Sequence, residues 1–358
     1  MVDPRKQKLF VTFLVVLMLG LLIFGFAVPT LAAGKLETVK VVFPRARELA
    51  GEDVYLHIAN KMGYAAEEGI QFTFESALGT VDCTKLISTG QADVAYPSSY
   101  VAITARSKGL PIKMIYDTLQ TNIFGFGVRP DSGIKSIRDL KGKKIALGDS
   151  GWTVIAAPIL KAAGLTEKDV EWVVAGEGRQ LAVWEKKTDA VLTWEMEYQN
   201  WASSGISLRF LAGQDYLDYQ SNGLTVSDAL IQKRPDLVER IARAAAKGAV
   251  FSLENPEAAA EIALETFPGV TPKSFKGMVD VVKALNALMA PPWTKDKGLG
   301  VCLMEKWQKQ IDDMYAAGVI LNKIRAEDVV SNRFIKAAND FDHERIRQDA
   351  RNYVLKRK

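Results

Sequence analysis

The chain has 358 residues, of which 48% are hydrophobic and 25% charged, and its formal net charge is +4 at neutral pH. This composition is typical of a globular protein of about two domains, so it excludes a disordered or fibrous chain. Without residues 1–33, which carry three positive charges and one negative charge, the net charge is +2. That charge is too small for a nucleic-acid-binding surface.

The first residues are typical of an export signal. Arg5, Lys6 and Lys8 precede an uncharged run over residues 9–30, and the small residues of Leu31-Ala32-Ala33-Gly34 favour cleavage after Ala32 or Ala33. The run approaches the roughly 20 apolar residues that span a bilayer, so an uncleaved anchor is the alternative. Both interpretations place the rest of the chain in the periplasm or elsewhere outside the cytoplasmic membrane.

After residue 34, short apolar runs alternate with longer segments in which apolar residues recur every three or four positions. This alternation predicts an α/β protein with parallel sheets. The predicted strands are TVKVVF, IQFTFES, ADVAYP, IKMIYD, FGFGVR, KKIALG, VEWVVAG, DAVLTW and LRFLAG. Helices are predicted between them, and from about Asp228 only helices follow.

The strands form two groups, which indicates two α/β lobes with a ligand cleft between them and a helical C-terminal region. We therefore expect five segments. They are a signal peptide or anchor (1–33), the first part of lobe 1 (34–121), lobe 2 (122–217), a helical return to lobe 1 (218–343) and a basic tail (344–358).

Candidate ligand-binding residues follow the predicted strands, because ligands of open α/β sheets bind at the carboxyl ends of the strands. Many of them are small or hydroxyl residues at helix starts, where free N–H groups can hold an anion, although such residues are also ordinary helix caps. The candidates are Arg45, Gly79, Thr80, Ser98, Ser99, Thr121, Ser150, Trp152, Thr153, Arg179, Trp194 and Glu195.

The sequence Gly148-Asp149-Ser150-Gly151 is similar to the nucleophile loop of a serine protease. A serine nucleophile needs a base, and the chain has only His57, in a predicted helix near its apolar face, and His343, in a charged segment. The loop also continues with Trp152 and Thr153. We therefore expect no catalytic residue, and we expect Ser150 to cap a helix and donate to a ligand.

The charge of the ligand stays open at this stage. Arg45 and Arg179 are suited to a carboxylate or sulfonate, whereas Glu195 is suited to an amine or a heterocyclic N–H donor. Trp152 and Trp194 provide aromatic faces for either kind of ligand.

Two further features concern metals and redox state. Cys83 and Cys302 would lie in an oxidising compartment, where a disulfide and two buried free thiols are equally compatible with the sequence. No Cys/His cluster has the spacing of a metal site, so neither a metal nor a cofactor is expected.

Several stretches carry a family resemblance: GYAAEEGIQFTF, LISTGQADVAYPSSYVAITARSKGLPIKMI, DSGIKSIRDLKGKKIALGDSG, TDAVLTWEMEY and GVILNKIRAEDVVSNRFIKAANDFD. From about Val39 to Phe341 the chain resembles the periplasmic solute-binding proteins of ABC importers. The branch is the one that includes sulfonate, taurine, nitrate and thiamine-precursor binders.

The resemblance implies a two-lobe, type II-like periplasmic binding protein. Such a protein closes on a small molecule and docks as a monomer on a membrane permease. Closure would bring Ser98 and Ser99 toward the Ser150–Trp152 loop. A small organic anion is the first expected ligand and a pyrimidine-like heterocycle the second. A secreted hydrolase, and a receptor that signals rather than transports, are the remaining alternatives.

Overall fold

The computed structural model describes residues 35–44, 53–77, 79–266 and 274–356. The predicted export signal, Arg45 and the last two residues of the basic tail lie outside the described residues, as does the side chain of Thr80. From Glu37 to Lys358 the chain forms one compact unit. Among the described residues, no helix is long and apolar enough to cross a membrane.

Two five-stranded sheets organise the chain. The first has the order β2-β1-β3-β10-β4 and the second the order β7-β6-β8-β5-β9. The strands of the first sheet are β1 (Glu37–Phe43), β2 (Ile70–Ser76), β3 (Val94–Ala95), β4 (Ile112–Asp117) and β10 (Gly223–Ser227). Those of the second are β5 (Phe124–Val128), β6 (Lys144–Leu147), β7 (Glu171–Val174), β8 (Ala190–Trp194) and β9 (Arg209–Ala212).

All nine predicted strands form, but the expectation of purely parallel sheets is wrong. In the first sheet β10 runs antiparallel to β3 and β4, and in the second β5 runs antiparallel to β8 and β9. The tenth strand, β10, was not predicted. An apolar run indicates that a strand is buried but not the direction in which it pairs, so the sequence pattern could not distinguish mixed from parallel sheets.

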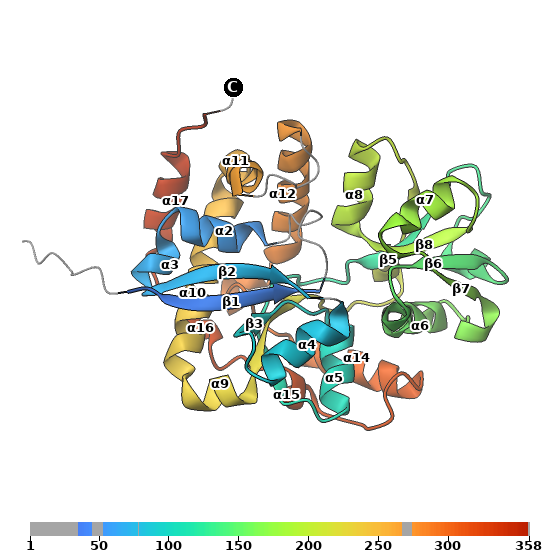
Figure 1. The fold of residues 1–358 in the computed structure, drawn as a ribbon, viewed down its shortest axis with the longest axis horizontal. Coiled ribbons are helices and arrows are strands. Elements are labelled where there is room, and N and C mark those ends of the chain that lie inside the picture. Colours follow the sequence, from blue (N-terminus) through green and yellow to red (C-terminus); the bar gives the residue numbers. More distant parts are fainter. Residues whose placement is uncertain (1–34, 45–52, 78, 267–273, 357–358) are drawn as a thin grey trace, which may run out of the picture. The chain divides into compact units, whose positions relative to one another are not determined.

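Helices cover both faces of each sheet. Figure 1 shows α2 on one side of β1 and β2, and α4 with α5 on the other. In the second sheet α7 and α8 lie on one side of β6 and β8, and α6 lies on the opposite side (Figure 1). Their bounds are α2 (Val54–Lys61), α3 (Tyr64–Glu67), α4 (Thr80–Ser88), α5 (Ser99–Ser107), α6 (Thr153–Ala162), α7 (Arg179–Trp184) and α8 (Glu195–Ser203).

The helical C-terminal region forms as predicted, and its helices pack on the first sheet and on α2. They are α9 (Asp228–Lys233), α10 (Pro235–Glu254), α11 (Pro256–Thr266), α12 (Phe275–Met289), α13 (Thr294–Lys297), α14 (Met304–Ala316), α15 (Ala326–Val329), α16 (Ile335–Ala338) and α17 (His343–Arg351). The exact division into lobes at residues 121 and 217 stays a proposal.

Two segments connect the sheets, and they are hydrogen-bonded to each other. The first connection (118–123) leads from β4 to β5, and the second (213–222) leads from β9 back to β10. The Ser221 amide donates to the Leu119 carbonyl at 2.8 Å, and the Leu119 amide donates to the Asn222 carbonyl at 2.9 Å. These backbone hydrogen bonds hold the two connections side by side.

The longest helix, α10, contacts α2 at a glycine. A Cβ atom on Gly248 would lie only 1.9 Å from the Tyr55 carbonyl oxygen, a separation that no side chain can adopt. The two helix backbones therefore approach each other closely because position 248 has no side chain.

Gly248→Ala should destabilise the fold, because α10 must shift away from α2 and leave part of the core underpacked. We expect the free energy of unfolding to fall by about 1–3 kcal/mol, as is usual for overpacked cores. Urea unfolding monitored by circular dichroism measures this change. Gly178→Ala is the matched control, since a Cβ there meets no atom within 4 Å and the backbone φ is −87°. Equal midpoints for the two variants would contradict the close approach.

Candidate functional site

The predicted residues of the first sheet lie at helix starts, but their hydroxyl groups are largely engaged. Ser98 caps α5, with its Oγ accepting from the Val101 amide at 3.4 Å. Ser99 is fully buried; its Oγ donates to the Gln220 carbonyl at 2.9 Å and accepts from Gln310 Nε2 at 2.9 Å. Ser99 thus ties α5 to the second connection, a structural role that the sequence pattern did not reveal.

Gly79 immediately precedes α4 and faces the loop that follows β6. Its φ of 147° lies in the region that favours glycine, and a Cβ there would lie 3.8 Å from Asp149 Oδ2. The structure therefore brings a strand end of the first sheet close to a strand end of the second. Thr121 lies in the first connection and is half-buried.

Asp149, rather than Ser150, caps the short helix that leads into α6. Its Oδ1 accepts from the Gly151 amide at 2.7 Å, whereas the Ser150 side chain is exposed. Thr153 Oγ1 donates back to the Ser150 carbonyl at 3.1 Å. The prediction that Ser150 caps a helix is therefore wrong. An aspartate one residue earlier is the stronger cap, because a carboxylate also interacts favourably with the helix dipole.

Trp152 turns back over the end of β6. A Cβ on Gly148 would lie 2.7 Å from Trp152 Cζ2, so the indole lies against the glycine backbone. Trp194 is the last residue of β8, the parallel neighbour of β6. The two indole rings meet edge to face with centroids 5.8 Å apart and planes inclined by 64°. The two tryptophans predicted from strand ends thus form one aromatic corner.

Arg179 does not present its charge to a ligand in this structure. The side chain is 1% exposed, and its Nη2 donates to both carboxylate oxygens of Glu197, which is 2% exposed. Thr193 Oγ1 adds a bond of 3.1 Å to the same carboxylate. The guanidinium expected to bind an anionic ligand is instead neutralised inside the protein.

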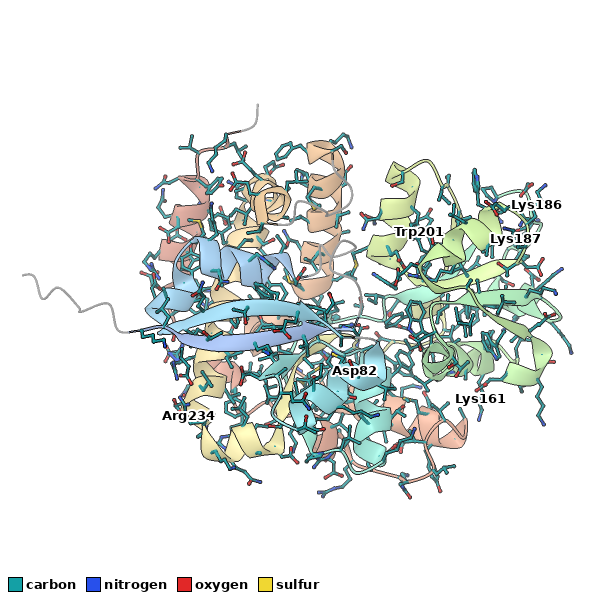
Figure 2. The ribbon with its side chains drawn as sticks, in the orientation of Figure 1. Asp82, Lys161, Lys186, Lys187, Trp201 and Arg234 are labelled. Carbon is teal, nitrogen blue, oxygen red and sulfur yellow. The ribbon has the colours of Figure 1, made fainter. Side chains whose placement is uncertain are left out.

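Three indoles surround this ion pair. The guanidinium carbon of Arg179 lies 4.7 Å from the ring centroid of Trp152, 5.4 Å from that of Trp194 and 5.5 Å from that of Trp201. Trp201, labelled in Figure 2, lies on α8 and is buried. The buried guanidinium of Arg179 is therefore attracted electrostatically to the faces of the indole rings that form the aromatic corner.

Glu197 is a site residue that the sequence analysis missed. It stands two residues after Glu195 in the first turn of α8, and only the tertiary fold decides which of the two carboxylates meets Arg179. Burial raises the pKa of Glu197, and the neighbouring Arg179 opposes that rise. The second glutamate of EMEY is the only feature of the sequence that points to Glu197.

Glu195 is the other carboxylate of this turn, and it directly follows Trp194. Its side chain is half-buried, and burial raises the pKa of its carboxyl group. Its amide donates to the Ile123 carbonyl at 3.1 Å, but the side chain has no ion pair within the described part of the chain. The Glu195 carboxylate, which follows Trp194 in the chain, is therefore a candidate hydrogen-bond acceptor for a ligand.

The two histidines have partners on other elements. His57 of α2 stacks on Phe74 at 3.9 Å and lies 3.5 Å from Asp53, and His343 Nε2 lies 3.0 Å from the Asn339 carbonyl on the C-terminal helices. Among the described residues, no group of three or more His, Cys, Asp or Glu side chains is arranged to hold a metal ion. Cys83 and Cys302 are both buried free thiols, so the disulfide alternative does not form.

Several proteins of known name are similar in sequence. A riboflavin-binding protein of Chloroflexus aurantiacus is 27% identical over 290 residues, covering 78% of this chain and 81% of that protein. A formylaminopyrimidine-binding protein of Halalkalibacterium halodurans is 24% identical, covering 83% and 90%. A 4-amino-5-hydroxymethyl-2-methylpyrimidine phosphate synthase of Legionella pneumophila is 25% identical, covering 59% and 68%.

The fold also matches solved structures. The alkanesulfonate-binding protein SsuA of Xanthomonas axonopodis pv. citri superposes with a TM-score of 0.64 at 15% identity, over 84% of this chain and 99% of that one. The chain thus has the two-sheet fold of the solute-binding proteins of ABC import systems. The family model described as NMT1/THI5 like matches residues 54–259, more than half of the chain. The protein therefore belongs to the NMT1/THI5-like family.

Proposed function

We propose that the protein is an extracytoplasmic receptor that captures a flat nitrogen heterocycle and delivers it to an ABC permease. The observation that carries the proposal is the aromatic corner of Trp152 and Trp194, and the half-buried Glu195 directly follows Trp194 in the chain. A flat ring can stack on an indole face, and a carboxylate accepts the N–H groups that such heterocycles present.

The charge at the strand ends favours this ligand over an organic anion. Arg179 is paired with Glu197, and the chain carries the carboxylates of Asp149 and Glu195 close in sequence to the two tryptophans. The guanidinium of Arg179, 4.7 Å from the Trp152 ring centroid, is already paired with Glu197 and is therefore not free to neutralise an anionic ligand. The organic anion that the sequence favoured therefore becomes the second candidate, and Arg45, outside the described residues, is the side chain that could support it.

The named relatives support the same ligand class. One is named for binding riboflavin and another for binding a formylaminopyrimidine, and both compounds are planar nitrogen heterocycles. Binding without turnover is proposed because the similar fold belongs to binding proteins and because, among the described residues, no histidine is hydrogen-bonded to the Ser150 hydroxyl. The synthase names among the relatives make turnover the alternative to test.

Location and partner complete the proposal. The export signal predicted over residues 1–33 would place the receptor outside the cytoplasmic membrane, where it would work as a monomer with its permease. The two hydrogen-bonded connections between the sheets are suited to a closing motion around a ligand, because few residues would have to change conformation.

Calorimetry of the purified protein with riboflavin, formylaminopyrimidine and thiamine should give saturable binding of at least one compound, without product formation. Micromolar affinity corresponds to about 8 kcal/mol, which stacking and a few charge-assisted hydrogen bonds can provide after the costs of ordering. Taurine, an alkanesulfonate and nitrate are the comparison ligands. Saturable binding of a sulfonate together with none of any heterocycle would contradict the proposal, and so would conversion of a bound heterocycle to product.

Trp152→Ala should weaken heterocycle binding by about tenfold or more, since stacking on an aromatic side chain contributes about 1–3 kcal/mol per ring. Melting temperature and circular dichroism check that the variant is folded. Trp184→Ala is the matched control, because Trp184 is an exposed tryptophan on α7. An unchanged affinity in folded Trp152→Ala would remove this residue from the site.

Glu195→Gln should stabilise the protein at neutral pH while weakening heterocycle binding. Burial raises the folded-state pKa of Glu195, so the native state loses stability as pH rises through that pKa, and glutamine avoids this loss. The gain in melting temperature should shrink between neutral pH and pH about 4, where the native carboxyl group of Glu195 is protonated. The exposed Glu167→Gln variant is the control. A Glu195→Gln variant that is less stable at neutral pH, or equally good at binding, would be evidence against this role.

A further inference from the structure

A cavity lies away from the strand ends, among the C-terminal helices. It is open to solvent, has a volume of about 940 Å³, and lies between α10, α13, α16, α17 and the segment before α14. This volume is in the range of small-molecule sites. Its apolar lining consists of Val250, Leu253, Ala290, Leu299, Val301 and Ile335.

Cationic side chains outnumber acidic ones around the cavity. Lys295, Lys297, Lys336 and Arg347 line it, against the carboxylates of Glu254 and Asp296. Glu254 is itself paired with Arg351 at 2.7 Å. None of the three lysines has an ion pair with another described residue. Arg347 is paired with Glu344 at 3.4 Å and with Glu254 at 4.0 Å, so the three lysines are the cationic side chains left unpaired beside the apolar lining.

The wall of the cavity is bonded to both connections between the sheets. The Val301 carbonyl accepts from Gln120 Nε2 at 3.0 Å and from Gln220 Nε2 at 2.8 Å. Gln120 belongs to the first connection and Gln220 to the second, and Gln220 Nε2 also donates to Gln120 Oε1 at 2.7 Å. Trp293, just before α13, donates to the same Oε1 at 2.9 Å.

We propose that this cavity binds a small amphipathic anion, an apolar chain that ends in one carboxylate, and that the bound anion restrains the two connections. The chain lies on the apolar floor, and the carboxylate lies among the rim lysines. Binding there orders the segment around Val301, and this segment holds both glutamines. The second ligand therefore acts on the motion that opens and closes the strand-end site, at a place that shares no residue with that site.

Decanoate is the probe for the first test, with decanol and decyltrimethylammonium as neutral and cationic comparisons. Calorimetry on the full chain should show saturable decanoate binding and much weaker binding of the other two. The double variant Lys297→Glu/Lys336→Glu should bind decanoate about tenfold or more weakly, because the rim charge is reversed. Lys108→Glu, at an exposed lysine beyond α5, should bind as the unchanged protein does.

Several results would overturn the proposal. One is the absence of saturable decanoate binding, and another is equal binding by the double variant and the Lys108→Glu control when both have the melting temperature of the unchanged protein. Loss of decanoate binding in Trp152→Ala would also overturn it, since the probe would then occupy the strand-end site. Because decanoate binding is measured without a heterocycle, this test stands apart from the proposed receptor function.

Hydrogen exchange tests the coupling to the connections. Saturating decanoate should slow amide exchange over residues 118–123 and 217–222 severalfold in the unchanged protein and leave it unaltered in the double variant. Unaltered exchange in the unchanged protein at saturation would overturn the coupling.

Discussion

The buried ion pair between Arg179 and Glu197 is the interaction on which the candidate site depends. A desolvated guanidinium is tolerated only when it is paired and hydrogen-bonded, and removing one partner of such a pair costs about 3–5 kcal/mol. Glu197 comes from α8 and Arg179 from α7, so the pair fixes both helix starts at the edge of the second sheet. The three indoles pack on the same cation. The ion pair that buries the charge of Arg179 therefore also positions Trp152 and Trp194.

A second constraint is the pairing of the two connections. Each connection has a glutamine that bonds to the other glutamine and to the Val301 carbonyl. A change of angle between the sheets must either break these hydrogen bonds or move Gln120, Gln220 and Val301 together. The C-terminal helices therefore do more than cover the first sheet. The segment around Val301, between α13 and α14, is hydrogen-bonded to both connections between the sheets.

Much of the fold could be predicted from the sequence, and the failures have a common physical origin. Apolar runs identify nine strands because burial in a sheet requires them, but the antiparallel direction of β5 and β10 depends on where the chain enters the sheet. The strand-end rule selected Trp152 and Trp194, whose rings the structure brings into contact, and Glu195, which directly follows Trp194; their role in binding stays a prediction. It also selected Arg179, whose internal partner Glu197 lies on another helix, because a sequence shows a charge but not its tertiary contacts.

The burial that pairs Arg179 with Glu197 also bears on what the proposed heterocycle site would distinguish. With the charge of Arg179 paired internally, the candidate site has the half-buried Trp152, the buried Trp194 and a half-buried carboxyl group whose pKa is raised by burial. Such a group accepts hydrogen bonds when it is ionised and can donate one when it is protonated, and burial moves this change to a higher pH than in an exposed glutamate. Discrimination among heterocycles would then rest on the hydrogen-bonding pattern of the ring edge, and stacking would supply affinity to all of them.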